Sequence, residues 1–386
     1  MTSFNTDRFK FGIEAQFMLA RATDCRPLWV HDVDAEQLLD IIDSIDTDHL
    51  PIDGFTTKPL HRRPSHFLVD GYTLMDAEMQ PMKLLPKGIE IRTPACSSID
   101  KSVEMLQDLH VRMNGALRKC GLTSAIVSHH PEEVQFVAPR NNAQNDLWQA
   151  ALVATTTYGP DINISLPSDQ VERVNREELH EKINYYMPAL VALSLNSSIV
   201  AGALWMVRKE VGKSIYTYRR SMSAPLYMVH QKPQLRFEFK GFEIAERLDD
   251  YAAYFLMCLA LLLDDKLRGR ASDQTRVFDL RACAVMGLAS EWVRTRGMQV
   301  IESAARIGSG FGFDIAPLDE MARRIDRRCL PADDLAQQFI ASNNSIRELI
   351  ASRQSFIPRR TNAPFVAPVR VDLTLMQQLP VLAALR

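Results

Sequence analysis

The stretch FGIEAQFML, residues 11–19, decides how the chain is interpreted, because it places polar and apolar side chains in alternation. Successive side chains of a β-strand point to opposite faces of a sheet. Glu14 and Gln16 therefore share one face, and Ile13, Ala15 and Phe17 share the other. The pattern predicts a half-buried strand whose polar face is available for chemistry.

Three later segments repeat this pattern, each with ionisable or amide side chains on one face and apolar side chains on the other. They are residues 88–93 with Glu90 and Arg92, residues 161–166 with Asp161, Asn163 and Ser165, and residues 235–239 with Arg236 and Glu238 beside Lys240. For any single strand, the better interpretation is that one face is exposed to solvent and carries charged residues. Four such strands together favour one shared polar cavity.

The rest of the chain is mostly helical by its apolar spacing. Helices are predicted at residues 35–45, 98–119 and 176–195 and through most of 243–352, with Pro188 kinking the third helix or dividing it in two. Two further strands are predicted at 67–74 and 123–128, and loops at 81–86 and 308–312. The basic pairs 323–324 and 327–328 are predicted to lie on a solvated helix face.

These elements predict the α+β class, with an antiparallel sheet that lines an acidic cleft and helices that flank it. We expect a single catalytic domain over residues 1–355, sheet-rich in 1–242 and mainly helical in 243–355. The C-terminal tail, 356–386, carries Pro358, Pro364 and Pro368 and few periodic signals, so we expect it to pack on the surface or to close over a site.

The composition is that of an ordinary globular enzyme, with 46% hydrophobic and 24% charged residues and a formal net charge of -2. No basic excess indicates a nucleic-acid partner. The six cysteines form no C-x-x-C pair, which argues against a zinc ribbon or a disulfide framework. The N-terminal residues do not have the pattern of a secretory signal, and the apolar run 251–263 is too short to cross a membrane, so we expect a cytoplasmic protein.

The residues of the polar faces favour cation and phosphate chemistry. Carboxylate oxygens are the ligands that hard divalent cations require, and four carboxylates are candidates for them: Glu14, Glu90, Asp161 and Glu238. Positive charge for a phosphate or a substrate carboxylate can come from Arg92, Arg219, Arg220, Arg236 and Lys240.

Several short motifs resemble, in the same order, landmarks of the glutamate–cysteine ligases and related carboxylate–amine ligases. They are GIEAQF (12–17), GIEIRTP (88–94), SHHP (128–131), GPDINISLP (159–167), PALVALSLNSS (188–198) and LRFEFK (235–240). Each motif is short, but together they cover residues 10 to 240. The resemblance implies a curved antiparallel sheet related to that of glutamine synthetase, which forms a funnel where acidic residues bind Mg²⁺ around ATP.

The resemblance also implies roles for individual residues. Glu14, Glu90 and Glu238 resemble metal-binding glutamates, and Asp161 stands where a ligating His is common. Gln16 replaces a second acidic residue and Lys240 replaces an Arg. By these roles the catalytic residues are Lys240, Arg236 and Arg220, the cofactor-binding residues Arg219, Asn163 and His130, the substrate-binding residues Arg92 and Asn196, and the metal ligands Glu14, Glu90, Asp161 and Glu238. A structural role for His130 and a helix-end role for Asn196 stay open.

The reaction that the resemblance implies is ATP- and Mg²⁺-dependent amide formation through an acyl phosphate, with glutamate as the acid and cysteine or another amine as the partner. Both substrates are small molecules, and a homo-oligomer is compatible with the sequence. Two alternatives remain, a phosphotransferase that stops at the phosphorylated acid and a degenerate homologue that binds a nucleotide without turnover.

Overall fold

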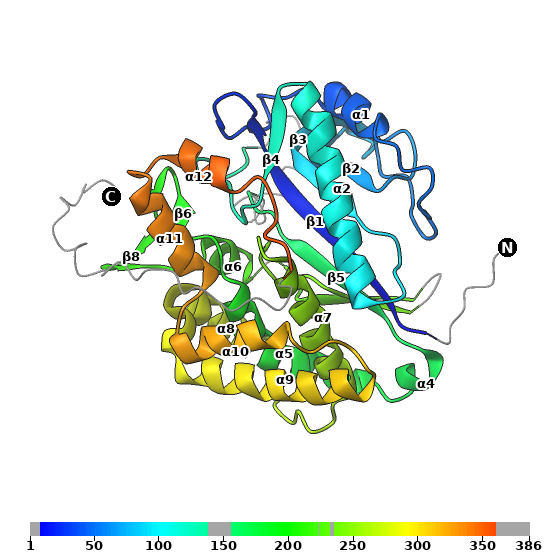
Figure 1. Ribbon diagram of the computed structural model, residues 1–386, viewed down its shortest axis with the longest axis vertical. Helices are drawn as coiled ribbons and strands as arrows, with labels where there is room; N and C mark the ends of the chain where they lie inside the picture. The colour runs from blue at the N-terminus through cyan, green and yellow to red at the C-terminus, as the bar shows by residue number, and fades with distance from the viewer. Residues whose placement is uncertain (1–7, 138–155, 223, 232–234, 360–386) are drawn as a thin grey trace.

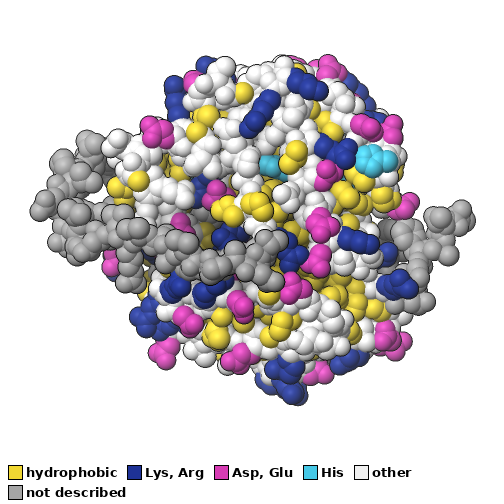
Figure 2. Space-filling model, in the orientation of Figure 1, with side chains coloured by type: hydrophobic (Ala, Val, Ile, Leu, Met, Phe, Trp, Pro, Cys, Tyr) yellow, Lys and Arg dark blue, Asp and Glu magenta, His cyan; other side chains and the backbone are white. Residues whose placement is uncertain are grey.

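The computed structural model describes residues 8–137, 156–222, 224–231 and 235–359, which form a sheet and a helical half (Figure 1). The sheet occupies one half of the view with α1 (Ala35–Asp43) and α2 (Ile99–Lys119) beside it, and most helices of residues 176–327 occupy the other. Figure 2 shows that Lys and Arg side chains are interspersed with Asp and Glu on this face of the molecule.

Every pairing within the sheet is antiparallel, and its strands come from the whole first two thirds of the chain. In order across the sheet they are β10 (Tyr227–His230), β11 (Arg236–Phe239), β5 (Pro160–Ser165), β1 (Lys10–Arg21), β3 (Pro81–Arg92) and β2 (Phe67–Met75), while β4 (Leu122–Ala125) pairs with the end of β1. Two small hairpins are separate: β6 (Ile199–Val200) with β7 (Ala203–Leu204), and β8 (Met206–Val207) with β9 (Glu210–Val211). The strands predicted from alternation are therefore present.

The predicted loop at residues 81–86 is wrong, because β3 begins at Pro81. Proline lacks a backbone N–H, but the first residue of a strand and an irregular position both tolerate this. Pro86 faces Gly71 where the pairing with β2 shifts register after Asp70. The two backbones approach so closely that a Cβ on Gly71 would lie 2.1 Å from the carbonyl oxygen of Leu85. Such an irregularity is not visible in the local sequence.

The apolar face of β1 packs against helices. Phe11, Ile13 and Phe17 are buried, and α2 and α7 (Leu248–Leu263) cover this side of the sheet. Removing one fully buried Phe side chain typically costs about 3–5 kcal/mol, so this face anchors the sheet firmly. The polar side chains of the same strands must then lie on the opposite face.

The helical half agrees with the predicted periodicity, with three corrections. Pro188 lies within one continuous helix, α5 (Arg176–Ser194), so it does not divide the helix in two, and the glycines of the predicted 308–312 loop begin inside the last turn of α9 (Glu291–Gly310). Arg324 is buried, contrary to the predicted solvated face, because Asp250 lies opposite it. The remaining helices are α4 (Ser168–Val171), α6 (Ile215–Arg220), α8 (Asp273–Met286), the 3-10 turn η2 (Gly287–Ala289), α10 (Leu318–Arg327), α11 (Pro331–Ala341) and α12 (Ile346–Ser352).

The start of the predicted C-terminal tail packs on the molecule, where Phe356 contacts Phe17 and His110. Residues 360–386 of that tail lie outside the described residues. Among the helices described, none is both long and apolar enough to span a membrane.

Candidate active site

Strand register brings the predicted polar residues onto one face of the sheet. Residues directly opposite each other in an antiparallel pair share a face. Glu14 lies opposite Asp161 on one side and opposite Arg92 on the other. Asn163 lies opposite Glu238. Segments about 220 residues apart in the sequence are thus joined in one acidic face.

The central feature of this face is a cluster of three carboxylates. One carboxylate oxygen each from Glu14, Asp161 and Glu238 lies within 4.8 Å of the others. The Asn163 side-chain nitrogen donates to Glu14 at 3.4 Å, and its side-chain oxygen is buried without a hydrogen-bond partner among the described residues. We call Glu14, Asp161 and Glu238 the acidic cluster.

Two cationic side chains from β11 and the residue after it partly neutralise the acidic cluster. The Lys240 ammonium donates to both Asp161 and Glu238. The Arg236 guanidinium donates to Glu14 at 3.3 Å and to Glu238 at 3.5 Å. Because both cations contact carboxylates and line the same face, they are also placed to contact an anionic ligand.

The pKa values show how crowded the carboxylates are. Burial, followed by the charges of Glu14, Asp70 and Asp161, raises the pKa of Glu90 to about 8. Burial also raises the pKa of Asp161, to about 6, although Lys240 opposes the shift. Burial acts on Glu238 too, but Lys240 and its other cationic neighbours hold its pKa below the ordinary value. Glu90 therefore holds its proton at neutral pH, and the carboxyl groups of the face outnumber the cations that contact them.

The donor set suits a divalent cation. Mg²⁺ prefers carboxylate oxygens and usually keeps several waters, so a few ligands suffice. Glu14 and Asp161 offer oxygens at the required proximity, and the Glu90 carboxylate forms no hydrogen bond or ion pair with any described residue. Lys240 restricts the available oxygens of Asp161 and Glu238. The three carboxylates of the acidic cluster therefore fit magnesium. Glu14 contacts one protein cation, Arg236, and Glu90, which is not part of the cluster, contacts none among the described residues.

Arg92 lies on the acidic face but is held by protein groups. Its guanidinium stacks on Phe55, 4.4 Å from the ring centre, and donates to the carbonyl of Ser65 at 2.6 Å. Its Nε is buried without a hydrogen-bond partner among the residues described. Arg92 can therefore present only part of its guanidinium to a ligand.

Arg219 and Arg220 end helix α6 and contact different partners. Arg220 donates to the Tyr216 hydroxyl at 2.6 Å. Arg219 contacts His129 Nε2 at 3.1 Å and donates to the carbonyl of Val134. Within the described part of the chain, neither forms a hydrogen bond or an ion pair with the acidic cluster, so their predicted catalytic and cofactor-binding roles stay predictions.

His130 and Asn196 lie apart from the acidic cluster. His130 Nδ1 accepts from the backbone N–H of Glu133 at 2.9 Å, and burial lowers its pKa to about 4. Asn196 is buried after α5, where its side chain donates to the carbonyl of Ile244 at 3.1 Å. Both side chains stabilise local backbone here, and their predicted ligand-binding roles are untested.

Sequence reasoning missed two groups on or beside this face. His230 Nε2 contacts Glu238 across the β10–β11 pair, and the alternation of YMVH, 227–230, was a usable signal for it. Lys87 forms an ion pair with Asp70 at 3.2 Å, and Asp70 in turn raises the pKa of Glu90. No local signal indicates that second pair, because it depends on the irregular pairing of β2 and β3.

A small cavity of about 150 Å³ opens at one end of the acidic face. Glu14, Asn163 and Arg236 line it from the sheet, and Phe55 lines it from the loop before β2. A carboxylate, an amide and a guanidinium around one cavity offer both donors and acceptors to a small polar molecule.

No protein-family model matches the chain, and no curated protein matches it in sequence. Solved structures share its fold. One is glutamate–cysteine ligase from Francisella tularensis, solved in complex with AMP. The similarity covers 90% of this chain and 88% of that chain, with a TM-score of 0.59 and 10% sequence identity.

Two other ligase structures are similar over the same share of this chain. One is a bifunctional glutathione synthetase from Pasteurella multocida, with a TM-score of 0.55, 13% identity and 51% of that chain covered. The other is the ligase PafA, solved with the prokaryotic ubiquitin-like protein Pup, with a TM-score of 0.54, 12% identity and 73% of that chain covered. The predicted fold, a curved antiparallel sheet of the glutamine synthetase and glutamate–cysteine ligase type flanked by helices, is therefore confirmed.

Proposed function

We propose that the protein is an ATP- and Mg²⁺-dependent carboxylate–amine ligase that joins the γ-carboxylate of glutamate to an amine, cysteine or a related compound. The observation that carries the proposal is the acidic cluster, three carboxylates from three strands beside Lys240 and Arg236. The cluster lies on the polar face of a sheet fold shared with structures named as ligases, one of them holding AMP.

The proposed reaction has two steps. A carboxylate oxygen of the acid attacks the γ-phosphorus of ATP, the bond from that phosphorus to its bridging oxygen breaks, and ADP leaves an acyl phosphate. The amine nitrogen then attacks the acyl carbon, inorganic phosphate leaves with the electron pair of the broken C–O bond, and the nitrogen loses a proton to solvent. Both steps depend chiefly on positioning and on compensation of negative charge.

The residues of the acidic face have distinct parts in this proposal. Glu14, Asp161 and Glu238, with Glu90 near them, would hold magnesium, which would supply positive charge to the phosphates. Lys240 and Arg236 offset charge on the transferring phosphoryl group, since their cationic groups already lie among the carboxylates.

The acid substrate is placed by the guanidiniums and by the small cavity. Arg236 lines that cavity, and Arg92 lies opposite Glu14 on the same face. Guanidinium groups recognise carboxylates through paired hydrogen bonds. We therefore assign the α-carboxylate of the acid to this end of the sheet.

The test is release of inorganic phosphate from ATP, measured with Mg²⁺ and glutamate, with and without a panel of amines that includes cysteine. We expect release to need the metal, an acid and an amine together. It should be lost in Glu14→Ala and Glu238→Ala proteins that stay folded by circular dichroism, and kept in Glu36→Ala, whose glutamate is exposed on α1.

Other outcomes separate the alternatives. ADP and a phosphorylated acid formed without any amine would replace the ligase with a phosphotransferase. ATP binding without turnover for any acid and amine would replace it with a nucleotide-binding homologue that has lost activity.

A further inference from the structure

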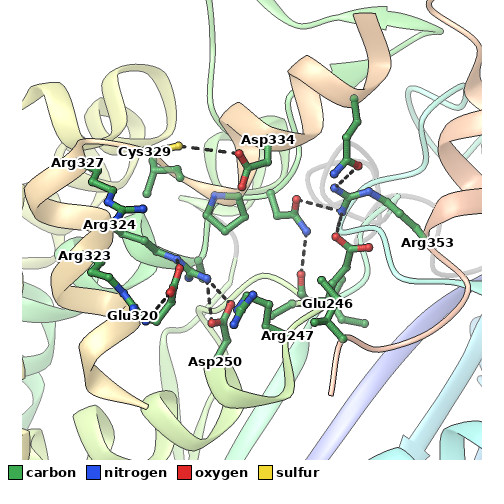
Figure 3. A pocket seen from close by; sticks show the side chains of 18 residues that line it. Glu246, Arg247, Asp250, Glu320, Arg323, Arg324, Arg327, Cys329, Asp334 and Arg353 are labelled. Carbon is green, nitrogen blue, oxygen red and sulfur yellow. Dashed lines mark hydrogen bonds and ion pairs between the residues drawn. The ribbon is translucent and has the colours of Figure 1, made fainter. Parts of the chain in front are cut away.

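A second cavity lies away from the acidic cluster, among the C-terminal helices. Its volume is about 730 Å³, within the range of pockets that hold drug-sized ligands. Five arginine and four carboxylate side chains line it, and none of the residues of the acidic cluster does. Figure 3 shows these side chains around one hollow, with Arg324 and Glu320 on one side, Asp334 above, and Glu246 and Arg353 opposite.

Buried ion pairs build the wall of this cavity. Arg324 donates to both oxygens of Asp250, at 2.8 and 2.7 Å, and both residues are almost fully buried. Arg353, 2% exposed, forms an ion pair with Glu246 at 3.2 Å. Because these charges compensate each other, they hold the wall in shape rather than attract a ligand.

Two other side chains in the wall have few direct partners and opposite charges. Within the described residues, the Arg247 guanidinium makes no hydrogen bond and one ion pair, 4.0 Å from Asp249. From the residues that the structure describes, the Asp334 carboxylate accepts only a weak bond, from the Cys329 thiol, with Sγ 3.9 Å from Oδ1. Both are partly exposed and line the cavity, so each has capacity for a ligand group.

We propose that this cavity binds a short peptide with free termini, whose carboxylate contacts Arg247 and whose ammonium group contacts Asp334. A zwitterion offers a direct partner to both side chains at once, whereas an anion or a cation alone offers one to only one of them. The cavity volume favours a peptide of a few residues over a single amino acid. This inference is independent of the proposed function, because it uses none of the residues of the acidic face.

The test is isothermal titration calorimetry of the full chain with trialanine, N-acetyl-trialanine and trialanine amide. We expect trialanine to bind, and each capped peptide to bind about 10–100-fold more weakly, since each has lost one charged hydrogen-bonding group. Alanine and dialanine in the same series measure the dependence on length.

Variants then assign each terminus of the peptide. Asp334→Asn should weaken the binding of trialanine about 10–100-fold and leave the binding of N-acetyl-trialanine unchanged. Arg247→Gln should weaken the binding of trialanine by a similar factor and leave the binding of trialanine amide unchanged. The matched control is the exposed pair Arg112 and Asp108 on α2, where Arg112→Gln should change nothing. Glu14→Gln should keep trialanine binding, which separates this cavity from the acidic cluster.

Three outcomes would overturn the proposal: no binding of trialanine, equal binding of the free and capped peptides, or equal losses in Glu14→Gln and Asp334→Asn. The capped peptides are tested on the unmodified protein, so the proposal stays testable even if one cavity variant does not fold.

Discussion

The acidic face of the sheet and the helical half both bury charged side chains, but they balance charge differently. In the helical half, Arg324 and Asp250 form a two-bond pair in which each charge has its counter-charge. On the sheet, carboxylates outnumber their cations, and the pKa of Glu90 is raised to about 8. A matched pair serves the fold, whereas an excess of one sign remains available for a ligand of the opposite sign.

The largest expected effect comes from unbalancing the matched pair. Asp250→Asn keeps the side-chain shape but leaves the buried Arg324 charge with only the more distant Glu320 carboxylate, 3.8 Å away, among the described residues. We expect the free energy of unfolding to fall by about 3–5 kcal/mol in urea titrations. Asp319→Asn, at an exposed position of the first turn of α10, is the control and should cost less than about 1 kcal/mol. Similar losses in both variants would contradict the structural role of the pair.

The second effect tests the cation of the acidic face and rests on the proposed function. Lys240→Met should lower the rate of phosphate release about 10²–10³-fold, the usual cost of losing one preorganised charge-stabilising group. Lys240→Arg keeps the positive charge and should retain most of the rate. Thermal unfolding of both proteins separates catalysis from folding. Equal rates in the two variants would remove Lys240 from the mechanism.

The third effect is the pH dependence that crowded carboxylates impose. The pKa of Glu90 is about 8 in the folded chain against an ordinary 4.5, so between these pH values the folded state holds a proton that the unfolded state has released. The free energy of unfolding must therefore fall as pH rises from about 4.5 to about 8. Glu90→Gln should reduce this fall by on the order of 1–2 kcal/mol, since Asp161 contributes in the same direction.

The measurement is urea unfolding from pH 5 to pH 8.5 in the presence of a chelator, on both proteins. Added Mg²⁺ should stabilise the unmodified protein more at pH 8 than at pH 6, because the cation competes with protons for the same oxygens. An identical pH profile for the two proteins would show that Glu90 does not carry the raised pKa.

The smallest effect concerns charges in contact with water. Arg62 contacts Glu36, Asp40 and Asp43 on α1, more carboxylates than Arg324 contacts at close range, but its side chain is 45% exposed. Arg62→Gln should lower the free energy of unfolding by less than about 1 kcal/mol. The comparison with Asp250→Asn in the same urea titrations then shows that burial, and not the number of ion pairs, decides the cost.

Much of the sheet was predictable because alternation is a local property. The residues of β1, β5 and β11 fall on the predicted faces, and the helix α2 begins and ends where its apolar spacing and its N-cap residue Ser98 indicate. Prediction failed where a distant backbone overrides local preference, as at Pro81, which begins a strand because β2 lies alongside it.

The same distinction holds for the candidate site. The sequence indicated which carboxylates and cations share a polar face, and its magnesium site at that face stays a prediction. It did not indicate that Lys240 bridges Asp161 and Glu238, or that His230 contacts Glu238, because these contacts depend on strand order. It also left His130 among the cofactor-binding candidates, although its ring is bonded to the nearby backbone.

The sequence by itself determined the periodicity of the elements and the face on which each side chain lies, since both follow from the geometry of one strand or helix. Only the tertiary structure decided which charges meet. Arg324 is buried because Asp250, 74 residues away, offers its counter-charge, and Glu14 faces Asp161 because β1 pairs with β5. Burial of a charge is a property of its partners, and partners distant in sequence are chosen by the fold.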